Sequence, residues 1–277
     1  MASGAPLLEL EKVSKRFGPV QALDRVDFAV HAGEVIGLVG DNGAGKSTMV
    51  KTIAGIHSAD EGTIRFNGEE VRIKGPQDAT ELGIATVYQD LALCDNLDVV
   101  ANLFLGHEEV APGLGRASRQ LDEARMEHET SELLSNLAVT IPSLRSEVGT
   151  LSGGQRQQVA VARSLLGDPK VVLLDEPTAA LGVSQTAQVL KLIRRLRERE
   201  LGVVVISHNL ADVFEVADRI FVLRLGRGGG EFDAQQTTEE HVIGAITGLG
   251  SGEKDNGGAE RAERAEIEAE KREEEEK

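Results

Sequence analysis

Three glycines interrupt an apolar region at residues 38–50, LVGDNGAGKSTMV, although glycine is unfavourable in both strands and helices. The run before them, EVIGLVG at 34–40, is short and unbroken, which is typical of a strand buried on both faces. The run after them, STMVKTIAGI at 47–56, is compatible with a helix. Between such elements, glycines let backbone N–H groups turn inward around an anion at the positive end of the helix. The spacing Gly40-x4-Gly45-Lys46-Ser47 therefore predicts a phosphate-binding loop.

The side chains of this loop indicate a nucleotide. Lys46 supplies a point charge for β- and γ-phosphates, and the hydroxyl of Ser47 suits a Mg²⁺ ligand. We expect the whole loop to contact the nucleotide: Gly40, Asp41, Asn42, Gly43, Ala44, Gly45, Lys46, Ser47 and Thr48.

Two acidic residues close a second apolar run, VVLLDEPTAAL at 171–181. They lie at the predicted carboxyl end of a strand, where α/β folds place their ligands. We expect Asp175 to hold a metal ion, directly or through water, and Glu176 to polarise an attacking water. Together with the phosphate loop, this pair predicts nucleotide hydrolysis.

The other apolar runs predict an α/β fold with a mostly parallel sheet. VVVIS at 203–207 and IFVL at 220–223 are further buried strands, and residues 184–200 carry apolar side chains at helical spacing. Strand, helix and strand in succession form the βαβ pattern. Residues 7–37 alternate in the manner of strands, and TIRFNGEEVRI at 63–73 predicts a hairpin that turns at Asn67-Gly68. Residues from about 95 to 165 predict helices and no strand, which indicates a helical insertion.

The segment LSGGQRQQVAVARSLL at 151–166 identifies the class of protein. Taken alone it is a helix start, because Ser152 can cap a helix and an apolar stripe follows two glycines. About twenty residues before an Asp-Glu strand end, however, LSGGQ resembles the signature of ATP-binding cassette (ABC) proteins. The resemblance extends from about residue 7 to residue 248.

This resemblance implies a fold and an activity. The fold is α/β, a P-loop NTPase core with a mostly parallel sheet, an N-terminal antiparallel β subdomain and a helical subdomain inserted at about 95–165. The ABC ATPase domain would span 7–248, followed by a flexible acidic tail at 249–277. The activity is that of an ATPase, with ATP and Mg²⁺ as its cofactors.

The resemblance also assigns three further site residues. Phe17, in VSKRFGPV, matches the aromatic residue that stacks on adenine. Gln89, in TVYQD, matches the glutamine that touches metal and water and couples to the partner subunit. His208, in VISHNL, matches the switch histidine that contacts the γ-phosphate. The expected catalytic residues are then Glu176, His208 and Gln89, and the expected metal ligands are Ser47, Gln89 and Asp175.

A single chain carries one phosphate loop and one signature. In the family, the signature of one cassette closes over the nucleotide held by another, and backbone amides at a helix start suit a second anion site. The resemblance therefore implies a head-to-tail, ATP-dependent dimer of two copies. The signature residues that would reach the nucleotide are Ser152, Gly153, Gly154 and Gln155.

Two segments resemble one subgroup, the ATPases of bacterial importers for monosaccharides such as ribose, xylose or fructose. They are TAALGVSQ, with Gly182 where the family usually has aspartate, and VYQDLALCDNLDVVANLFLG at 87–106. The departure at Gly182 leaves the cross-dimer contact open in detail. The subgroup implies a peripheral protein on the cytoplasmic face of the cell membrane, which works with permease subunits and indirectly with a sugar-binding protein. Two alternatives stay open: an importer ATPase for another substrate, and a soluble ABC ATPase that acts on ribosomes or DNA.

Composition restricts the partners. The chain has 30 basic and 46 acidic residues, which argues against a nucleic-acid footprint, so no nucleic-acid partner is expected. One cysteine, Cys94, excludes an intramolecular disulfide and fits a reducing compartment. No apolar run approaches 18 residues, so no membrane span is expected. Part of the acidic excess lies at 258–277, GAERAERAEIEAEKREEEEK, a charge run that we interpret as a solvated or fraying helix and not as a site.

Overall fold

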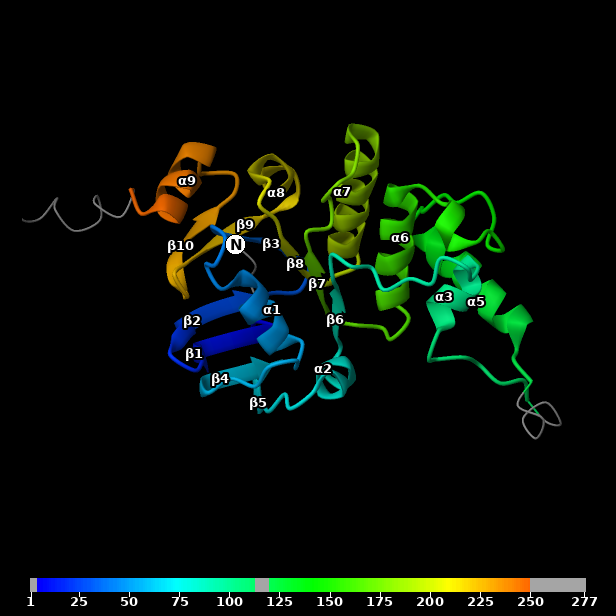
Figure 1. The fold of residues 1–277 in the computed structure, drawn as a ribbon, viewed down its shortest axis with the longest axis horizontal. Helices are drawn as coiled ribbons and strands as arrows, with labels where there is room; N and C mark the ends of the chain where they lie inside the picture. The colour runs from blue at the N-terminus through cyan, green and yellow to red at the C-terminus, as the bar shows by residue number, and fades with distance from the viewer. Residues whose placement is uncertain (1–3, 113–119, 250–277) are drawn as a thin grey trace, which may run out of the picture.

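The computed structural model describes residues 4–112 and 120–249. The acidic tail expected at 249–277 therefore lies, from residue 250 onward, outside the described residues, and its flexibility stays a prediction. The described strands form two sheets, which lie against each other on one side of the molecule, while the helices α3, α5 and α6 lie on the other side (Figure 1).

The larger sheet has the strand order β10-β9-β3-β8-β7-β6. Every neighbouring pair from β9 to β6 is parallel, and only β10 is antiparallel to its neighbour. The predicted mostly parallel sheet is thus confirmed. Its strands are β10 (Arg227–Asp233), β9 (Arg219–Arg224), β3 (Val35–Val39), β8 (Gly202–Ile206), β7 (Val171–Asp175) and β6 (Ile84–Val87).

The apolar runs of the central strands are unbroken because both faces of this sheet are covered. Alternate residues of β3 enter different core clusters: Ile36 and Leu38 face the smaller sheet and α1, whereas Val35 and Val39 face the side of α7 and α8. Burying each such side chain stabilises the fold by about 1.5–3 kcal/mol, so every position of the strand favours an apolar residue.

The smaller sheet is antiparallel, with the order β2-β1-β4-β5. It confirms the predicted N-terminal β subdomain. Asn67 and Gly68 both have positive φ, 51° and 80°, as a two-residue hairpin turn requires. The second hairpin strand is shorter than the sequence pattern suggests, because Ile73 is buried without pairing just before a helix that starts at Pro76. The strands are β1 (Leu8–Phe17), β2 (Val20–Val30), β4 (Glu61–Phe66) and β5 (Glu69–Val71).

The helices of the α/β core connect the strands and pack on the sheet. They are α1 (Lys46–Ile53), α2 (Pro76–Leu82), α7 (Val183–Glu198), α8 (Leu210–Val216) and α9 (Glu239–Thr247). The buried residues of α7 include the four expected from helical spacing, Val189, Leu192, Ile193 and Leu196. None of the helices in the described residues is long and apolar enough to cross a membrane.

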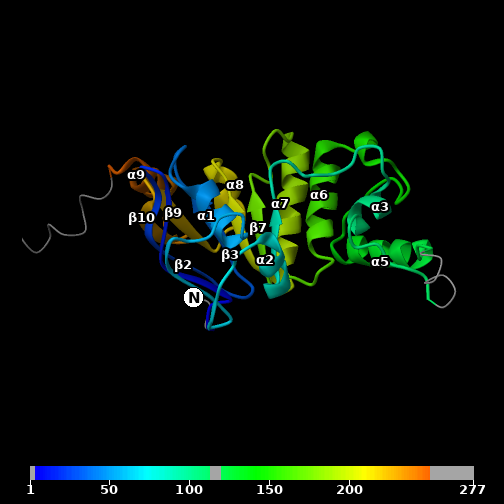
Figure 2. The ribbon, with the colours of Figure 1, turned by 60° about the horizontal axis from the view of Figure 1, so that its bottom comes forward.

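The region predicted to be a helical insertion contains α3 (Val99–Phe104), α5 (Glu123–Asn136), a short 3-10 helix (Val148–Thr150) and α6 (Gly153–Ser164). Among its described residues there is no strand, only the isolated bridges Asp98–Glu147 and Val110–Leu121. In the views of Figure 1 and Figure 2 alike, α7 lies between this helical region and α1. The limits of the insertion as a separate subdomain remain a prediction.

Candidate functional site

The glycine loop lies between β3 and α1, as its sequence predicts. Gly40 and Gly45 have φ values of 155° and 107°, which L side chains rarely adopt. A Cβ atom at Gly40 would lie 2.2 Å from the carbonyl oxygen of Leu223, and one at Gly45 would lie 2.6 Å from that of Ala22. The loop therefore follows a path that only glycine permits. No side chain of the described residues caps the N-terminus of α1, so the first backbone amides of this helix are available to an anion.

Lys46 folds back onto the loop. Its Nζ donates to the carbonyl oxygens of Gly40 and Asp41, at 2.7 and 3.0 Å. Burial lowers the pKa of Lys46, while the charges of Glu176, Asp41 and Asp175 oppose that shift. A partly desolvated ammonium group beside exposed helix amides is well suited to bind phosphate oxygens.

The acidic pair lies at the carboxyl end of β7, beside the glycine loop. Burial raises the pKa of Asp175, with a second contribution from the charge of Glu176, and Lys46 acts in the opposite direction. A bound cation would relieve both the desolvation and the repulsion of the two carboxylates. Carboxylate, hydroxyl and amide oxygens are the donors that Mg²⁺ prefers, so the predicted set of Asp175, Ser47 and Gln89 fits this ion.

Glu176 and His208 are brought together although they lie on different strands. Asp175 pairs with Ile206 in the parallel β7–β8 ladder, so the residues that follow emerge at the same edge. His208 Nδ1 lies 2.8 Å from Glu176 Oε2. The carboxylate side chain is 16% exposed and the imidazole 73%, so the histidine is the outer partner, open to an incoming ligand. This arrangement can orient a water molecule and sense a terminal phosphate.

Gln89 and Phe17 each lie at the end of a strand, and neither is buried. Gln89 follows β6 by two residues and is exposed. Phe17 is the last residue of β1 and is 42% exposed. Both positions are compatible with the roles implied by the family resemblance, which stay predictions.

The signature caps α6. The hydroxyl of Ser152 accepts a hydrogen bond from the backbone N–H of Gln155 at 3.3 Å, and Gln155 Oε1 accepts from the N–H of Ser152 at 3.0 Å. This capping box leaves the amides of Gly153 and Gly154 as the first unpaired donors of the helix. In both views β7 and α7 separate α6 from α1 (Figures 1 and 2). A single chain therefore does not bring its signature onto its own phosphate loop.

Gly182 is the N-cap residue of α7, next to the signature. Its φ and ψ of −75° and 162° are ordinary extended values, and a Cβ atom there would meet nothing within 4 Å. The backbone thus does not require glycine where the family usually has aspartate. The neighbouring Gly154 is more restricted, because its Cβ would lie 2.9 Å from that of Gln185.

Two hollows near the site were not predicted from the sequence. One, of about 670 Å³, has the glycine loop and His208 on one side and Glu239 and Ile243 of α9 on the other. No motif in the sequence marks α9 as a wall of this hollow. The second, of about 690 Å³, lies between α2 and β6 on one side and α3, α5 and α6 on the other.

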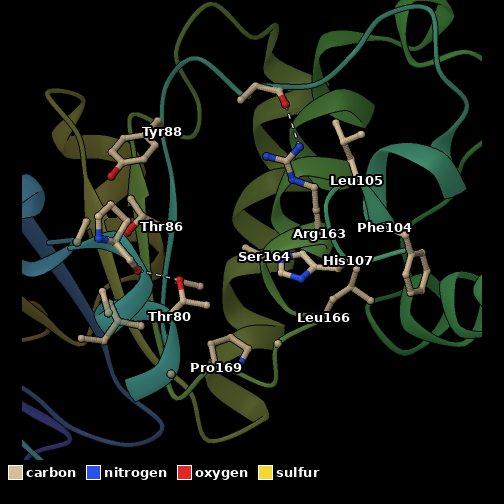
Figure 3. A pocket seen from close by; sticks show the side chains of 18 of the residues that line it. Thr80, Thr86, Tyr88, Phe104, Leu105, His107, Arg163, Ser164, Leu166 and Pro169 are labelled. Atoms are coloured by element: carbon tan, nitrogen blue, oxygen red, sulfur yellow. Dashed lines mark hydrogen bonds between the residues drawn. The ribbon is translucent and has the colours of Figure 1, made fainter. Parts of the chain in front are cut away.

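The second hollow is a groove with mixed chemistry (Figure 3). Thr86 and Tyr88 line it from the end of β6, and Phe104, Leu105 and His107 line it from the helical side. Arg163 crosses the upper part of the groove and donates to the carbonyl oxygen of Ala92 at 2.9 Å. Because Tyr88 directly precedes Gln89, this groove adjoins the predicted catalytic edge.

A buried amide holds the segment between Gln89 and α3. Asn102 is fully buried, and its Oδ1 accepts from the backbone N–H of Cys94 at 2.7 Å. Its Nδ2 donates to the carbonyl oxygens of Cys94, Leu97 and Asp98 at 3.0–3.1 Å. This residue gave no signal in the sequence, because a single asparagine in a helical stretch is not distinctive.

The chain is similar to known proteins in sequence and in fold. A family model described as ABC transporter matches residues 23–179. The fructose import ATP-binding protein FrcA of Rhizobium meliloti is 47% identical over 245 residues, which cover 88% of this chain and 94% of that protein. The xylose/arabinose import ATP-binding protein XylG of Sulfolobus acidocaldarius is 44% identical over 246 residues, 89% of this chain and 96% of that protein.

A similar solved structure is a dimeric ATP-binding cassette in a post-hydrolysis state with bound ADP and Pi. It aligns with a TM-score of 0.66 at 26% identity, and the alignment covers 83% of this chain and 100% of that chain. The predicted family and fold class are thus confirmed.

Proposed function

Because this chain belongs to the ABC transporter family, we propose that it is the ATP-hydrolysing subunit of an importer, most specifically one for a monosaccharide. The observation that carries the proposal is the convergence of the glycine loop, Asp175, Glu176 and His208 at one edge of the larger sheet. The names of its relatives support a sugar, since they are described as import proteins for fructose and for xylose or arabinose.

The proposed roles of the residues follow from their positions. The loop amides and Lys46 bind the β- and γ-phosphates, and Phe17 stacks on the adenine. Glu176 accepts a proton from the attacking water, while His208 holds the carboxylate and contacts the γ-phosphate. Ser47, Gln89 and Asp175 would hold Mg²⁺, which would supply positive charge to offset the negative charge of the phosphates.

The active unit we propose is a head-to-tail pair of two copies. The signature and the phosphate loop are both anion sites made of backbone amides, and one chain keeps them apart. A two-fold pair would place the signature of each copy over the loop of the other and enclose two ATP molecules. The dimeric relative among solved structures supports this arrangement.

We further propose that a permease docks in the groove shown in Figure 3, on the cytoplasmic face of the membrane. The groove has apolar walls from Phe104 and Leu105, acidic groups from Glu109 and Glu129, and adjoins Gln89 through Tyr88. A helix end of the permease that enters it would therefore move Gln89. A separate sugar-binding protein would act through the permease.

The dimer is tested with the Glu176→Gln variant, which should trap ATP unhydrolysed. Its mass by light scattering should double with ATP and return to that of the monomer with ADP, because ADP lacks the γ-phosphate that the second copy contacts. As a matched control, a Glu176→Gln chain that also carries Ser152→Arg should stay monomeric, because the added bulk blocks the signature. A chain that hydrolyses ATP as a monomer, with a rate linear in protein concentration, would overturn the two-chain mechanism.

The substrate is tested by disrupting the gene and measuring uptake of labelled fructose, xylose, arabinose and ribose. Loss of uptake of one of these sugars, restored by the wild-type chain but not by a Lys46→Ala chain, is the expected result. Normal uptake of all four together with loss of an amino acid would indicate an importer for another substrate. Unchanged uptake of every solute tested would favour a soluble ATPase.

A further inference from the structure

The loop that follows α1, residues 54–60, connects this helix to Phe17, because its His57 contacts the Phe17 ring. It starts from the last turn of α1, because the backbone N–H groups of Ile56 and His57 both donate to the carbonyl oxygen of Lys51, at 2.8 and 3.1 Å. Since α1 begins at Lys46, this loop is fixed to the same helix that presents its amides to the phosphates. The loop ends at Asp60, immediately before β4.

Asp60 ties the loop to the end of β1. Its Oδ1 accepts from Lys15 Nζ at 2.8 Å, and its Oδ2 accepts from the backbone N–H of Arg16 at 2.7 Å. Its own backbone N–H donates to the carbonyl oxygen of Ser14 at 2.9 Å. The hydrogen bond from Lys15, followed by that from Arg16, holds the pKa of Asp60 below its usual value. Asp60 thus forms hydrogen bonds with Ser14, Lys15 and Arg16, the three residues that directly precede Phe17.

The ring of Phe17 is itself held by the same group of residues. His57 meets it at 5.0 Å between ring centroids with an interplanar angle of 73°, an edge-to-face contact. Lys15 Nζ, already bound by Asp60, lies 5.5 Å from the ring centroid, within the range of a cation–π contact. Phe17 nevertheless remains 42% exposed, so ring surface is left for a ligand.

We propose that Asp60 and His57 are positioning residues for the adenine. Acting through Phe17, they set where the base stacks relative to the phosphate loop. This inference rests on the proposed role of Phe17 in ATP binding and goes beyond it. The reason is geometric: Phe17 belongs to the smaller sheet, whereas the phosphate loop leads from the larger sheet into α1, so the distance between them depends on what connects α1 to the end of β1. The Lys15–Phe17–His57–Asp60 cluster is such a connection, because His57 and Asp60 belong to the loop after α1 and Lys15 and Phe17 belong to β1.

The test compares two ligands of the wild-type and variant chains, ATP and inorganic tripolyphosphate, by isothermal titration. Tripolyphosphate has the phosphates but no base, so a residue that acts on the adenine affects only ATP. We expect Phe17→Ala to lower the affinity for ATP about tenfold, which is the effect of losing one stacked aromatic ring. Asp60→Ala and His57→Ala should each lower the affinity for ATP by about three- to tenfold. Affinity for tripolyphosphate should stay within about twofold in all three variants.

Conservative variants separate positioning from folding. Asp60→Asn keeps an oxygen for the N–H of Arg16, and His57→Phe keeps a ring edge for Phe17, so both should recover most of the ATP affinity. Asp233→Ala is the matched control, because Asp233 also accepts from a backbone N–H, that of Gln235 at 2.8 Å, but lies in β10. It should leave binding of both ligands unchanged.

The outcomes distinguish this inference from the function it rests on. If Phe17→Ala lowers the affinity for ATP while Asp60→Ala and His57→Ala do not, the positioning role is wrong and the adenine role of Phe17 stands. If Asp60→Ala lowers the affinities for ATP and tripolyphosphate equally, Asp60 supports the fold as a whole, and the inference fails as well. If Phe17→Ala has no effect on ATP, the assignment of the adenine site itself is wrong.

Discussion

Replacing Glu176 by glutamine tests the centre of the proposed mechanism. The exchange preserves the shape of the side chain at a position where the structure allows little freedom, since Glu176 has a φ of 50° and its backbone N–H donates to the carbonyl oxygen of Ile206 at 2.9 Å. The amide can still contact His208, which lies 2.8 Å from the carboxylate oxygen it replaces. What the variant loses is the basic oxygen that accepts a proton from water.

The expected loss in turnover is about 10²- to 10⁴-fold, the usual effect of removing a general base. This corresponds to about 3–5 kcal/mol of activation free energy. ATP binding should not weaken. Burial lowers the pKa of Lys46, and among the neighbouring carboxylates Glu176 opposes that shift most strongly. Because its negative charge lies this close to the phosphate loop, removing it takes a repulsive group away from the incoming triphosphate. Turnover and affinity should therefore change in different directions.

Phosphate release under saturating ATP measures the first quantity, and equilibrium titration of ATP measures the second. Glu198→Gln serves as the control, since Glu198 is exposed at the end of α7, and it should leave both quantities at their wild-type values. A Glu176→Gln chain that turns over within about tenfold of wild type would refute the assignment of this residue as the base.

Three further predictions test the site and the fold. Lys46→Ala should lose ATP affinity itself, because the variant removes the cation of the phosphate loop; unchanged binding by titration would count against that loop. Asn102→Ala leaves the backbone groups of Cys94 that it satisfies buried without partners, and should lower the free energy of unfolding in urea by about 3 kcal/mol, whereas an unchanged midpoint would show that water replaces the amide. Deleting residues 252–277 should leave ATPase activity and melting temperature nearly unchanged, because this segment offers only Ile267 as a large apolar residue, and a marked drop in either would show that it binds the core.

Much of the core could be predicted because its sequence patterns are local. The unbroken runs of β3, β7 and β8 indicated strands covered on both faces, and Asn67-Gly68 indicated the turn between β4 and β5. The closeness of Glu176 and His208 follows in part from the same reasoning. Parallel strands end at the same edge of a sheet, and each of these two residues comes just after a predicted parallel strand. That β7 and β8 are neighbours, however, depends on the packing of the whole sheet.

The contacts that surround the site could not be predicted in the same way. Asp60 reaches Lys15 across 45 positions of sequence, and nothing in the pattern around either residue indicates the other as its partner. The groove beside Tyr88 depends on how the helical region packs against β6, a contact between segments whose apolar patterns show only that each is amphipathic. Side chains that act through distant contacts leave no periodic signal in the chain.

The placement of Tyr88 has a spectroscopic consequence. The chain has one tyrosine and no tryptophan, and its seven phenylalanines emit only weakly and at shorter wavelength, so its tyrosine emission comes from this phenol alone. Tyr88 is half-buried, directly precedes Gln89 and lines the groove between β6 and the helical region. The tyrosine emission of an unlabelled sample should therefore report on this one location, because a segment that fills the groove would change the solvent around the only tyrosine. Tyr88 is thus an intrinsic fluorescent probe between the proposed nucleotide site and the surface where we place the permease.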